Sequence, residues 1–166
     1  MSDREGLLQA ETRHALETRG IEYEVMACDP ALADTAAFVA AYGVPLDRSA
    51  NTIVVASKGA DPRYAACILL ATTALDVNGV VRREMGVRKA SFAAAEPVRS
   101  QTGMEIGGVT PFGLPAGLPV LVDARVMEPE WIVLGGGNRS SKLRLSPTAL
   151  RELPDVRVVD GLATLR

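Results

Sequence analysis

The stretch MEIGGVTPFGLP, residues 104–115, gathers glycines and prolines around one hydroxyl side chain, Thr110. Gly107 and Gly108 have no Cβ atom, so a ligand can approach their backbone closely, whereas Pro111 restricts the conformation of the chain. Backbone N–H groups held in place can stabilise the oxyanion of an acyl transfer, and one such donor contributes roughly 2.7–4 kcal/mol. The stretch therefore predicts a site built from backbone amides, and a stiff surface connection is the alternative.

Other routes to catalysis have little material in this chain. Cys28 and Cys67 are the only cysteines, and His14 is the only histidine. No CxxC, HExxH or cysteine–histidine cluster is present to hold zinc, and a histidine-based triad is disfavoured. The cysteines are expected to be small buried side chains, and His14 a surface or packed residue. We therefore expect no metal site and no cofactor.

Nucleotide-binding loops and nucleic-acid-coating platforms are also disfavoured. There is no GxxxxGK[ST] or GxSxG, and the GGGN at 135–138 precedes a predicted turn and strand rather than a helix. Three phenylalanines, three tyrosines, one tryptophan and a net charge of -2 provide neither a stacking platform nor an overall positive field. Two local basic groups remain, for which a solvated surface is the alternative: Arg82, Arg83, Arg88 and Lys89, and then Arg139, Lys142 and Arg144.

The length and composition predict one globular domain over residues 1–166. A chain of 166 residues with 48% hydrophobic content can bury a sizeable core. The start, MSDREGLLQA, lacks the positive and apolar regions of a signal peptide. The longest mostly apolar stretch, residues 64–75, is shorter than the ~18 residues that a membrane helix needs. We therefore expect a cytoplasmic protein without membrane contact.

The first half of the chain alternates helices and strands. Residues 2–19 have helix-forming content with Ser2 or Asp3 as a cap, and residues 21–27 alternate as a half-buried strand does. A short helix follows, with Asp34 or Thr35 as its N-cap and Gly43 as its C-cap. Two apolar runs then predict a central hairpin, at residues 51–57 and 64–73.

The second half continues without a regular repeat. Asp76 can cap a helix that runs to Met85 and is closed by Gly86. Ser146 and Pro147 then mark the start of a last helix. Between these helices we expect strands at 87–93, 118–126, 131–137 and 142–145 and a short helix at 96–103. The fold class predicted is α+β, a single domain with one mixed, curled sheet flanked by helices.

Several of these stretches together resemble the YbaK/EbsC-type aminoacyl-tRNA deacylases, which are related to the editing domain inserted in bacterial prolyl-tRNA synthetases. The stretches are TGMEIGGVTPFGLP, VRKASFA, PVLVDARVM and VLGGGNRSSKLRLSPTAL, and the order of the N-terminal half, GIEYEVMACDPALADTAAFVAAYGVP before NTIVVAS, is also similar. The likeness covers nearly the whole chain. In that family a GxxxP loop frames the site, and it corresponds here to Gly107 through Pro111.

The resemblance also implies the reaction and the residues that serve it. The reaction is hydrolysis of the ester that joins a wrong amino acid to tRNA, assisted by backbone N–H groups and the 2′-hydroxyl of the terminal adenosine. Gly107, Gly108 and Thr110 would frame the carbonyl. Asn51, Lys89 and Asp123 would bind the acceptor end of the tRNA.

One position departs from the family pattern. Family members commonly carry a lysine at the start of the central strand, in a pattern like KTL, whereas this chain has Asn51 in NTI. An asparagine can donate and accept hydrogen bonds but carries no charge. Lys89 matches a second lysine position of the family and could supply a compensating charge.

Three functions are consistent with these residues. The first is a free-standing deacylase that clears a small mischarged amino acid from tRNA, with a synthetase as a candidate partner. A methylene contributes only ~1–3 kcal/mol to binding in a pocket, so a synthetase also accepts smaller amino acids and needs a second, editing step. The second is a binding module that has lost turnover through Asn51. The third is an acyl or amide hydrolase for a small molecule.

Overall fold

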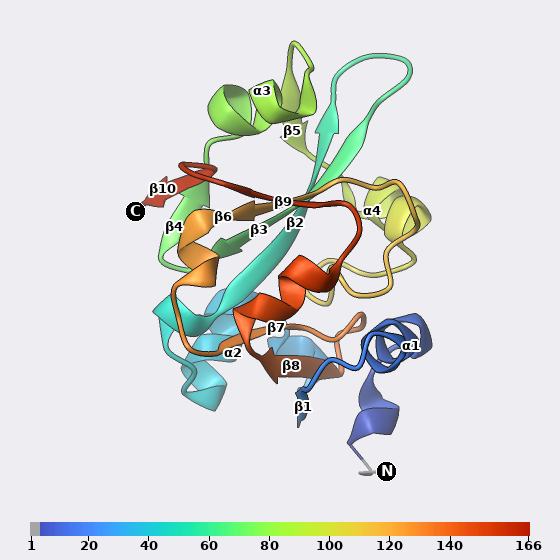
Figure 1. Cartoon of the computed structure of the whole chain (residues 1–166), viewed down its shortest axis with the longest axis vertical. Helices are drawn as coiled ribbons and strands as arrows, with labels where there is room; N and C mark the ends of the chain where they lie inside the picture. The colour runs from blue at the N-terminus through green and yellow to red at the C-terminus, as the bar shows by residue number, and fades with distance from the viewer. Residues whose placement is uncertain (1–3) are drawn as a thin grey trace.

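The structure of the protein is a computed structural model, which describes residues 4–166. Its largest sheet has five strands in the order β5-β2-β3-β6-β9 (Figure 1). β2 pairs antiparallel with β3 and β5, whereas β6 pairs parallel with β3 and β9. The bounds are β2 Ala50–Ser57, β3 Tyr64–Leu70, β5 Ala90–Phe92, β6 Val120–Asp123 and β9 Val156–Val159. The predicted α+β class with a mixed sheet and a central hairpin is confirmed.

The remaining strands form two smaller sheets, so the expectation of one sheet was wrong. β1 (Glu24–Ala27), β8 (Ser141–Leu145) and β7 (Ile132–Gly135) make an antiparallel sheet in the order β1-β8-β7. β4 (Thr73–Leu75) pairs with β10 (Ala163–Leu165). The three-stranded sheet meets the five-stranded one through the single bridge Ser49–Val133. Because hydrogen bonding stops after this bridge, the two sheets stay separate.

The central strands are buried on both faces, as their nearly continuous apolar sequence requires. On one face of β3, Ala66 and Ile68 belong to a core that also contains Leu150. On the other face, Ala65 and Cys67 pack in a cluster with Val81. Cys67 is therefore a buried side chain, as expected, and burial raises the pKa of its thiol to about 12.

The helices are short and mostly end at glycines. They are α1 (Ala10–Thr18), α2 (Thr35–Tyr42), α3 (Arg82–Met85) and α4 (Ala95–Thr102). Gly43 and Gly86 adopt the left-handed conformation at their C-caps with φ of 70° and 69°, which confirms both predicted stops. Asp76 accepts a hydrogen bond from the Val80 amide and so caps the π-helical turn before α3.

Two predicted helices differ in the structure. The first begins later than expected, with a 3₁₀ turn at Glu5–Leu7 and then α1, while the proposed caps Ser2 and Asp3 lie outside the described residues. The last is a 3₁₀ helix, Pro147–Glu152, capped by Ser146 as predicted.

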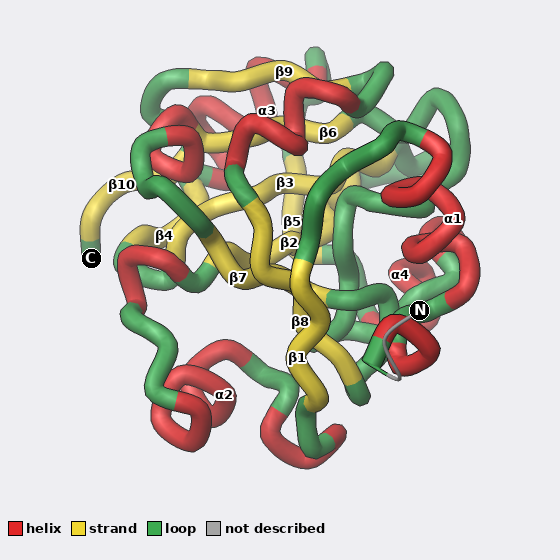
Figure 2. The backbone as a smooth tube through the Cα atoms, turned by 60° about the horizontal axis from the view of Figure 1, so that its bottom comes forward, coloured by secondary structure: helices red, strands yellow, loops and turns green. Residues whose placement is uncertain are grey.

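The ends of β2 face different surroundings. Figure 1 shows α2 beside the start of β2, whereas α3 and the β2–β3 turn lie near its far end. The tube view of Figure 2 separates α2 from α1 and α4, which lie together on another side of the molecule. No helix among the described residues is long and apolar enough to cross a membrane.

Candidate functional site

The glycine-proline loop is held through three consecutive carbonyl groups. The Ile106 oxygen accepts a hydrogen bond from Arg139 Nη1 at 2.7 Å, and the Gly107 oxygen accepts one from Lys142 Nζ at 2.8 Å. The Gly108 oxygen accepts one from the Gly137 amide at 2.8 Å. All three partners come from the segment that ends β7 and begins β8, so this segment fixes the loop.

This arrangement determines where the amides of the loop point. In a planar trans peptide the C=O and the following N–H point in opposite directions. The Ile106 carbonyl faces Arg139, so the Gly107 amide of the same peptide points the other way. The Gly108 carbonyl faces the Gly137 amide, so the Val109 amide also points away from its carbonyl's partner. Within residues 4–166 neither amide has a hydrogen-bond acceptor. The loop thus presents two preorganised backbone donors, the Gly107 and Val109 N–H groups.

Gly108 contributes differently from the prediction. Its amide donates to the Glu105 carbonyl at 2.9 Å and is therefore used inside the loop. A Cβ atom at this position would overlap the backbone of Asn138. The absence of a side chain thus permits close contact with the β7–β8 segment rather than with a ligand.

Gly107 is needed for two reasons. Its φ of 93° lies in the left-handed region, which L side chains rarely adopt. A Cβ atom here would also overlap the guanidinium of Arg139 and come within 2.8 Å of Asp34 Oδ1. The loop and the cation therefore fit together only with glycine at this position.

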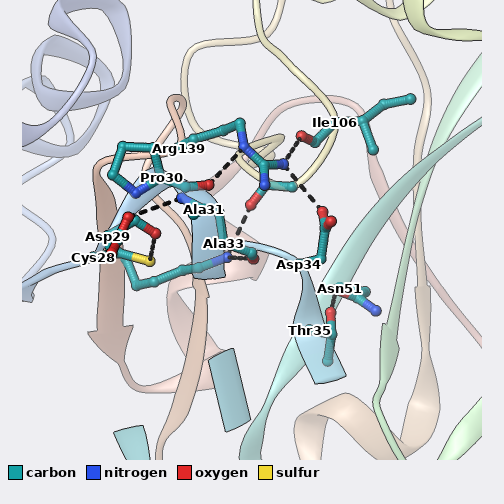
Figure 3. A network of polar contacts seen from close by, with 12 residues as sticks. Cys28, Asp29, Pro30, Ala31, Ala33, Asp34, Thr35, Asn51, Ile106 and Arg139 are labelled. Carbon is teal, nitrogen blue, oxygen red and sulfur yellow. Dashed lines mark hydrogen bonds and ion pairs between the residues drawn. The ribbon is translucent and has the colours of Figure 1, made fainter. Parts of the chain in front are cut away.

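Arg139 links its own segment to two others that are far from it in the chain, the loop and residues 30–34 (Figure 3). Besides the Ile106 carbonyl, its Nη1 contacts Asp34 Oδ1 at 3.0 Å and its Nε donates to the Pro30 carbonyl at 3.0 Å. Its side chain is only 24% exposed. The sequence had left Arg139 as part of a basic group with a solvated surface as the alternative, and the structure places it under the loop instead.

Lys142 is still more enclosed, with 7% exposure. Its Nζ donates to the Ala33 carbonyl at 2.7 Å and to the Gly107 carbonyl, and it lies 5.1 Å from the centre of the Phe38 ring. Burial lowers the pKa of this amine. The one sequence signal for this role is the scarcity of lysine, because the chain has only Lys58, Lys89 and Lys142.

Asn51 lies next to this network. It occupies the start of β2, is half-buried, and accepts a hydrogen bond through Oδ1 from Thr35 Oγ1. Figure 3 shows Asn51 and Thr35 beside Asp34 and on the same side as Ile106. Its neighbour Thr52 lines the same cavity as Ile106 of the loop, so Asn51 lies on the side of β2 next to the loop. Within the described chain the Asn51 Nδ2 donor has no partner.

Thr110 and Pro111 lie behind the loop. Both are buried, and Thr110 Oγ1 has no hydrogen-bond partner in the described part of the protein. The Thr110 amide is 3.5 Å from Met104 Sδ. Pro111 lines a cavity on the α1 side, together with Ala15. These positions support the loop from within the core.

Asp123 and Lys89 are not gathered at the loop. Asp123 is fully buried at the end of β6 and accepts a hydrogen bond from the Ala163 amide at 3.2 Å. Lys89 is exposed just before β5, which pairs only with the last three residues of β2. Asn51 and Ser57 lie six positions apart on β2, which corresponds to roughly 20 Å.

A mainly apolar cavity of about 230 Å³ adjoins the loop. Its lining comes from β2, from the end of β5, from α4 and from the loop itself, including Thr52, Val54, Phe92, Val98, Ile106 and Val109. Ile106 belongs both to this cavity and to the Arg139 contacts. No cluster of three or more potential metal-binding side chains exists among the described residues.

The arrangement combines two backbone donors, an amide side chain and an adjoining cavity. Such a site can hold a carbonyl oxygen as it becomes negative, without a nucleophilic side chain. His14 takes no part in it, because it is exposed on α1 and contacts Thr18. Cys28 lies near Lys142, but burial raises the pKa of its thiol, which disfavours the reactive thiolate.

Comparison with known proteins shows the family to which the chain belongs. The family model of the aminoacyl-tRNA editing domain matches residues 29–153. The uncharacterized protein YwhH of Bacillus subtilis (strain 168) is 33% identical over 110 residues, which cover 66% of this chain and 68% of that protein.

Solved structures of other proteins share the fold of this chain. Hypothetical protein APE2540 has a TM-score of 0.80 at 21% identity and covers 93% of this chain and 99% of its own. A proposed trans-editing enzyme for prolyl tRNA synthetase has a TM-score of 0.76 at 24% identity, over 96% of this chain and 97% of its own.

Proposed function

Because the chain belongs to the aminoacyl-tRNA editing domain family, we propose that it is a free-standing deacylase that removes a small mischarged amino acid from tRNA. The observation that carries the proposal is the orientation of the loop. Arg139 and Gly137 hold two of its carbonyls and leave the Gly107 and Val109 amides directed away from them. These amides are placed to stabilise an oxyanion.

In the proposed reaction water attacks the carbonyl carbon of the aminoacyl ester. The carbonyl oxygen becomes an oxyanion that accepts hydrogen bonds from the Gly107 and Val109 amides. The bond from the carbonyl carbon to the ribose oxygen then breaks, and the ribose oxygen takes one proton of the attacking water. The other water proton is released as the free amino acid forms its carboxylate. The neighbouring ribose hydroxyl assists the water or the leaving oxygen.

Asn51 orients the substrate in this proposal. Its Oδ1 is occupied by Thr35, so the side chain is held with Nδ2 as the remaining donor. That donor suits a ribose hydroxyl or the ester oxygen, both of which accept hydrogen bonds. The chain thereby uses a neutral donor where the family commonly has a charged one. No metal or other cofactor enters the reaction.

Lys89 serves the substrate at a distance in this proposal. It lies with Lys58 and Arg88 around an exposed hollow at the far end of β2, and the Lys58 amide donates to the Lys89 carbonyl at 3.1 Å. Within residues 4–166 none of these three cations has a carboxylate within 4.0 Å. We assign this group to the phosphates of the acceptor stem, because the ester would lie roughly 20 Å away at Asn51.

The wider setting follows from the same reaction. All 166 residues act as one editing domain, and a cytoplasmic location suits a substrate produced during tRNA charging. A solved protein of similar fold is a proposed trans-editing enzyme for prolyl tRNA synthetase, and we propose a synthetase as the partner of this chain as well. We assign Asp123 a structural role rather than substrate binding, because it is fully buried at the end of β6.

A panel of charged tRNAs tests the proposal. Purified protein is incubated with tRNAs carrying correct and incorrect amino acids, and release of the amino acid is followed over time. We expect hydrolysis of one or a few small mischarged amino acids. Binding without hydrolysis would favour the binding module instead, and hydrolysis of small esters but not of charged tRNA would favour the small-molecule hydrolase.

A further inference from the structure

The cavity beside the loop is bordered by an unpaired edge of β2. β5 pairs only with Val55, Ala56 and Ser57, and β7 is bridged to this part of the chain only at Ser49, so no strand pairs with Thr52 on the side away from β3. The last contact is the Ala93 amide, which donates to the Val54 carbonyl at 2.9 Å. This bond shows that the main-chain groups of Val54 point away from β3.

The alternation of an antiparallel pair extends this to Thr52. Residues two apart on a strand direct their N–H and C=O groups to the same side. The Thr52 main chain therefore also points away from β3, toward the cavity side. Within the described chain neither the Thr52 carbonyl nor the Val54 amide has a partner there. An acceptor and a donor thus stand next to each other on an open edge.

Two further observations mark this edge as a place for a ligand. Thr52 Oγ1 is buried and has no hydrogen-bond partner among the described residues. Phe92 lines the same cavity with 59% of its surface exposed, although aromatic side chains are scarce in this chain. A flat apolar ligand with polar atoms on one edge would cover the ring and satisfy the strand.

We propose that this cavity binds the adenine base of the nucleoside that carries the amino acid. The exocyclic amino group of the base donates to the Thr52 carbonyl, and the ring nitrogen beside it accepts from the Val54 amide. Phe92 stacks on the base, as aromatic side chains do with unpaired bases. The inference rests on the proposed function and names the part of the substrate that occupies the cavity.

The position of the cavity agrees with this occupant. Thr52 follows Asn51 directly on β2, and Ile106 precedes the Gly107 amide in the loop. A base in the cavity would therefore have its ribose near Asn51 and its ester near the loop. The order of polar atoms also selects among purines, because a 6-oxo purine presents an acceptor to the Thr52 carbonyl and a donor to the Val54 amide.

Binding of free nucleosides tests the inference without any hydrolysis. Backbone amide signals of ¹⁵N-labelled protein are followed by NMR during titration with adenosine and, separately, with inosine. We expect adenosine to shift the signals of Thr52 and Val54 and inosine to bind at least tenfold more weakly. Phe92→Ala should weaken adenosine binding by about tenfold, whereas Phe92→Tyr keeps a stacking ring and should retain it.

The outcomes separate this inference from the proposed function. Equal binding of both nucleosides, or adenosine shifts confined to other parts of the protein, would overturn the adenine site even if charged tRNA is hydrolysed. Adenosine binding at Thr52 and Val54 in a protein that hydrolyses no charged tRNA would support the site and count against the deacylase. Phe92 is exposed, so Phe92→Ala should remain folded, as circular dichroism would show.

Discussion

Lys142 Nζ lies 2.8 Å from the Gly107 carbonyl oxygen and 2.7 Å from the Ala33 carbonyl oxygen, so one buried amine holds both the loop and the segment before α2. The two carbonyls belong to residues 35 and 109 positions away in the sequence. The Gly107 peptide cannot rotate without losing this bond. Lys142 is therefore a positioning residue for the proposed oxyanion site.

Lys142→Met should uncouple the loop from its support. The two carbonyls would lose a donor, and leaving buried polar groups unsatisfied costs about 1–3 kcal/mol each. We expect a lower free energy of unfolding in urea titrations and a larger fall in kcat than in KM on charged tRNA. Lys142→Arg keeps a cation and should recover part of the activity. Unchanged kcat in a folded Lys142→Met protein would contradict the positioning role.

The stability difference between these proteins should depend on pH. Burial lowers the pKa of Lys142 below its ordinary value of 10.5, so between the lowered pKa and 10.5 the unfolded chain binds more protons than the folded one. The free energy of unfolding contributed by Lys142 therefore rises with pH in that interval. Urea titrations at several alkaline pH values should show wild type gaining on Lys142→Met. A constant difference would argue against the lowered pKa.

Gly108 and Thr110 should respond in opposite ways to small substitutions. Gly108→Ala places a Cβ atom against the backbone of Asn138, which would push the loop off the β7–β8 segment. We expect loss of stability and at least tenfold lower kcat/KM. Thr110→Val removes a buried hydroxyl without a partner and keeps the shape, so the free energy of unfolding should stay the same or rise. Thermal unfolding and deacylation rates measure both effects.

The basic group around Lys89 should determine the salt dependence of tRNA binding. Each lysine that contacts a phosphate contributes about one to the slope of log affinity against log salt. Lys58→Gln and Lys89→Gln should each reduce that slope by about one. Arg151→Gln makes the same charge change at an exposed position on the 3₁₀ helix Pro147–Glu152 and serves as the control. Slopes equal to that of wild type would exclude Lys58 and Lys89 from the contact.

Local signals predicted much of the fold. Gly43, Gly86, Asp76 and Ser146 act where caps and stops were expected, because capping depends on residues within one or two turns. The division into three sheets was not predicted, because pairings such as β1 with β8 join distant segments. β9 and β10 were also missed.

The candidate site was predicted in part for the same reason. The glycines of the loop and Asn51 were identified from their neighbours in the sequence and from the resemblance. The sequence did not reveal the role of Arg139 under the loop, because its contacts with Asp34 and Pro30 span more than a hundred residues. Lys89 was expected to compensate for Asn51 at the acceptor end, but it precedes the short β5, which pairs with the far end of β2.

Asn51→Lys should increase activity if the site binds the acceptor end. The ammonium would replace a neutral donor at the start of β2, and a hydrogen bond to a charged group contributes about 1.5–3 kcal/mol. We expect roughly a tenfold gain in kcat/KM on a small mischarged tRNA, because 1.4 kcal/mol corresponds to a factor of ten. The gain should be larger at low salt, because phosphate contacts weaken as salt rises.

The matched control is Asn51→Met, which has a side chain of lysine-like reach without charge. Both variants remove the acceptor of Thr35 Oγ1, so any difference between them reports the charge. The carboxylate of Asp34, which is paired with Arg139, would also attract the new ammonium and reduce the gain in activity. Combining Asn51→Lys with Asp34→Asn would then raise activity further. If wild type and Asn51→Lys both hydrolyse none of the charged tRNAs although both are folded, the deacylase proposal fails and the binding module becomes the better explanation.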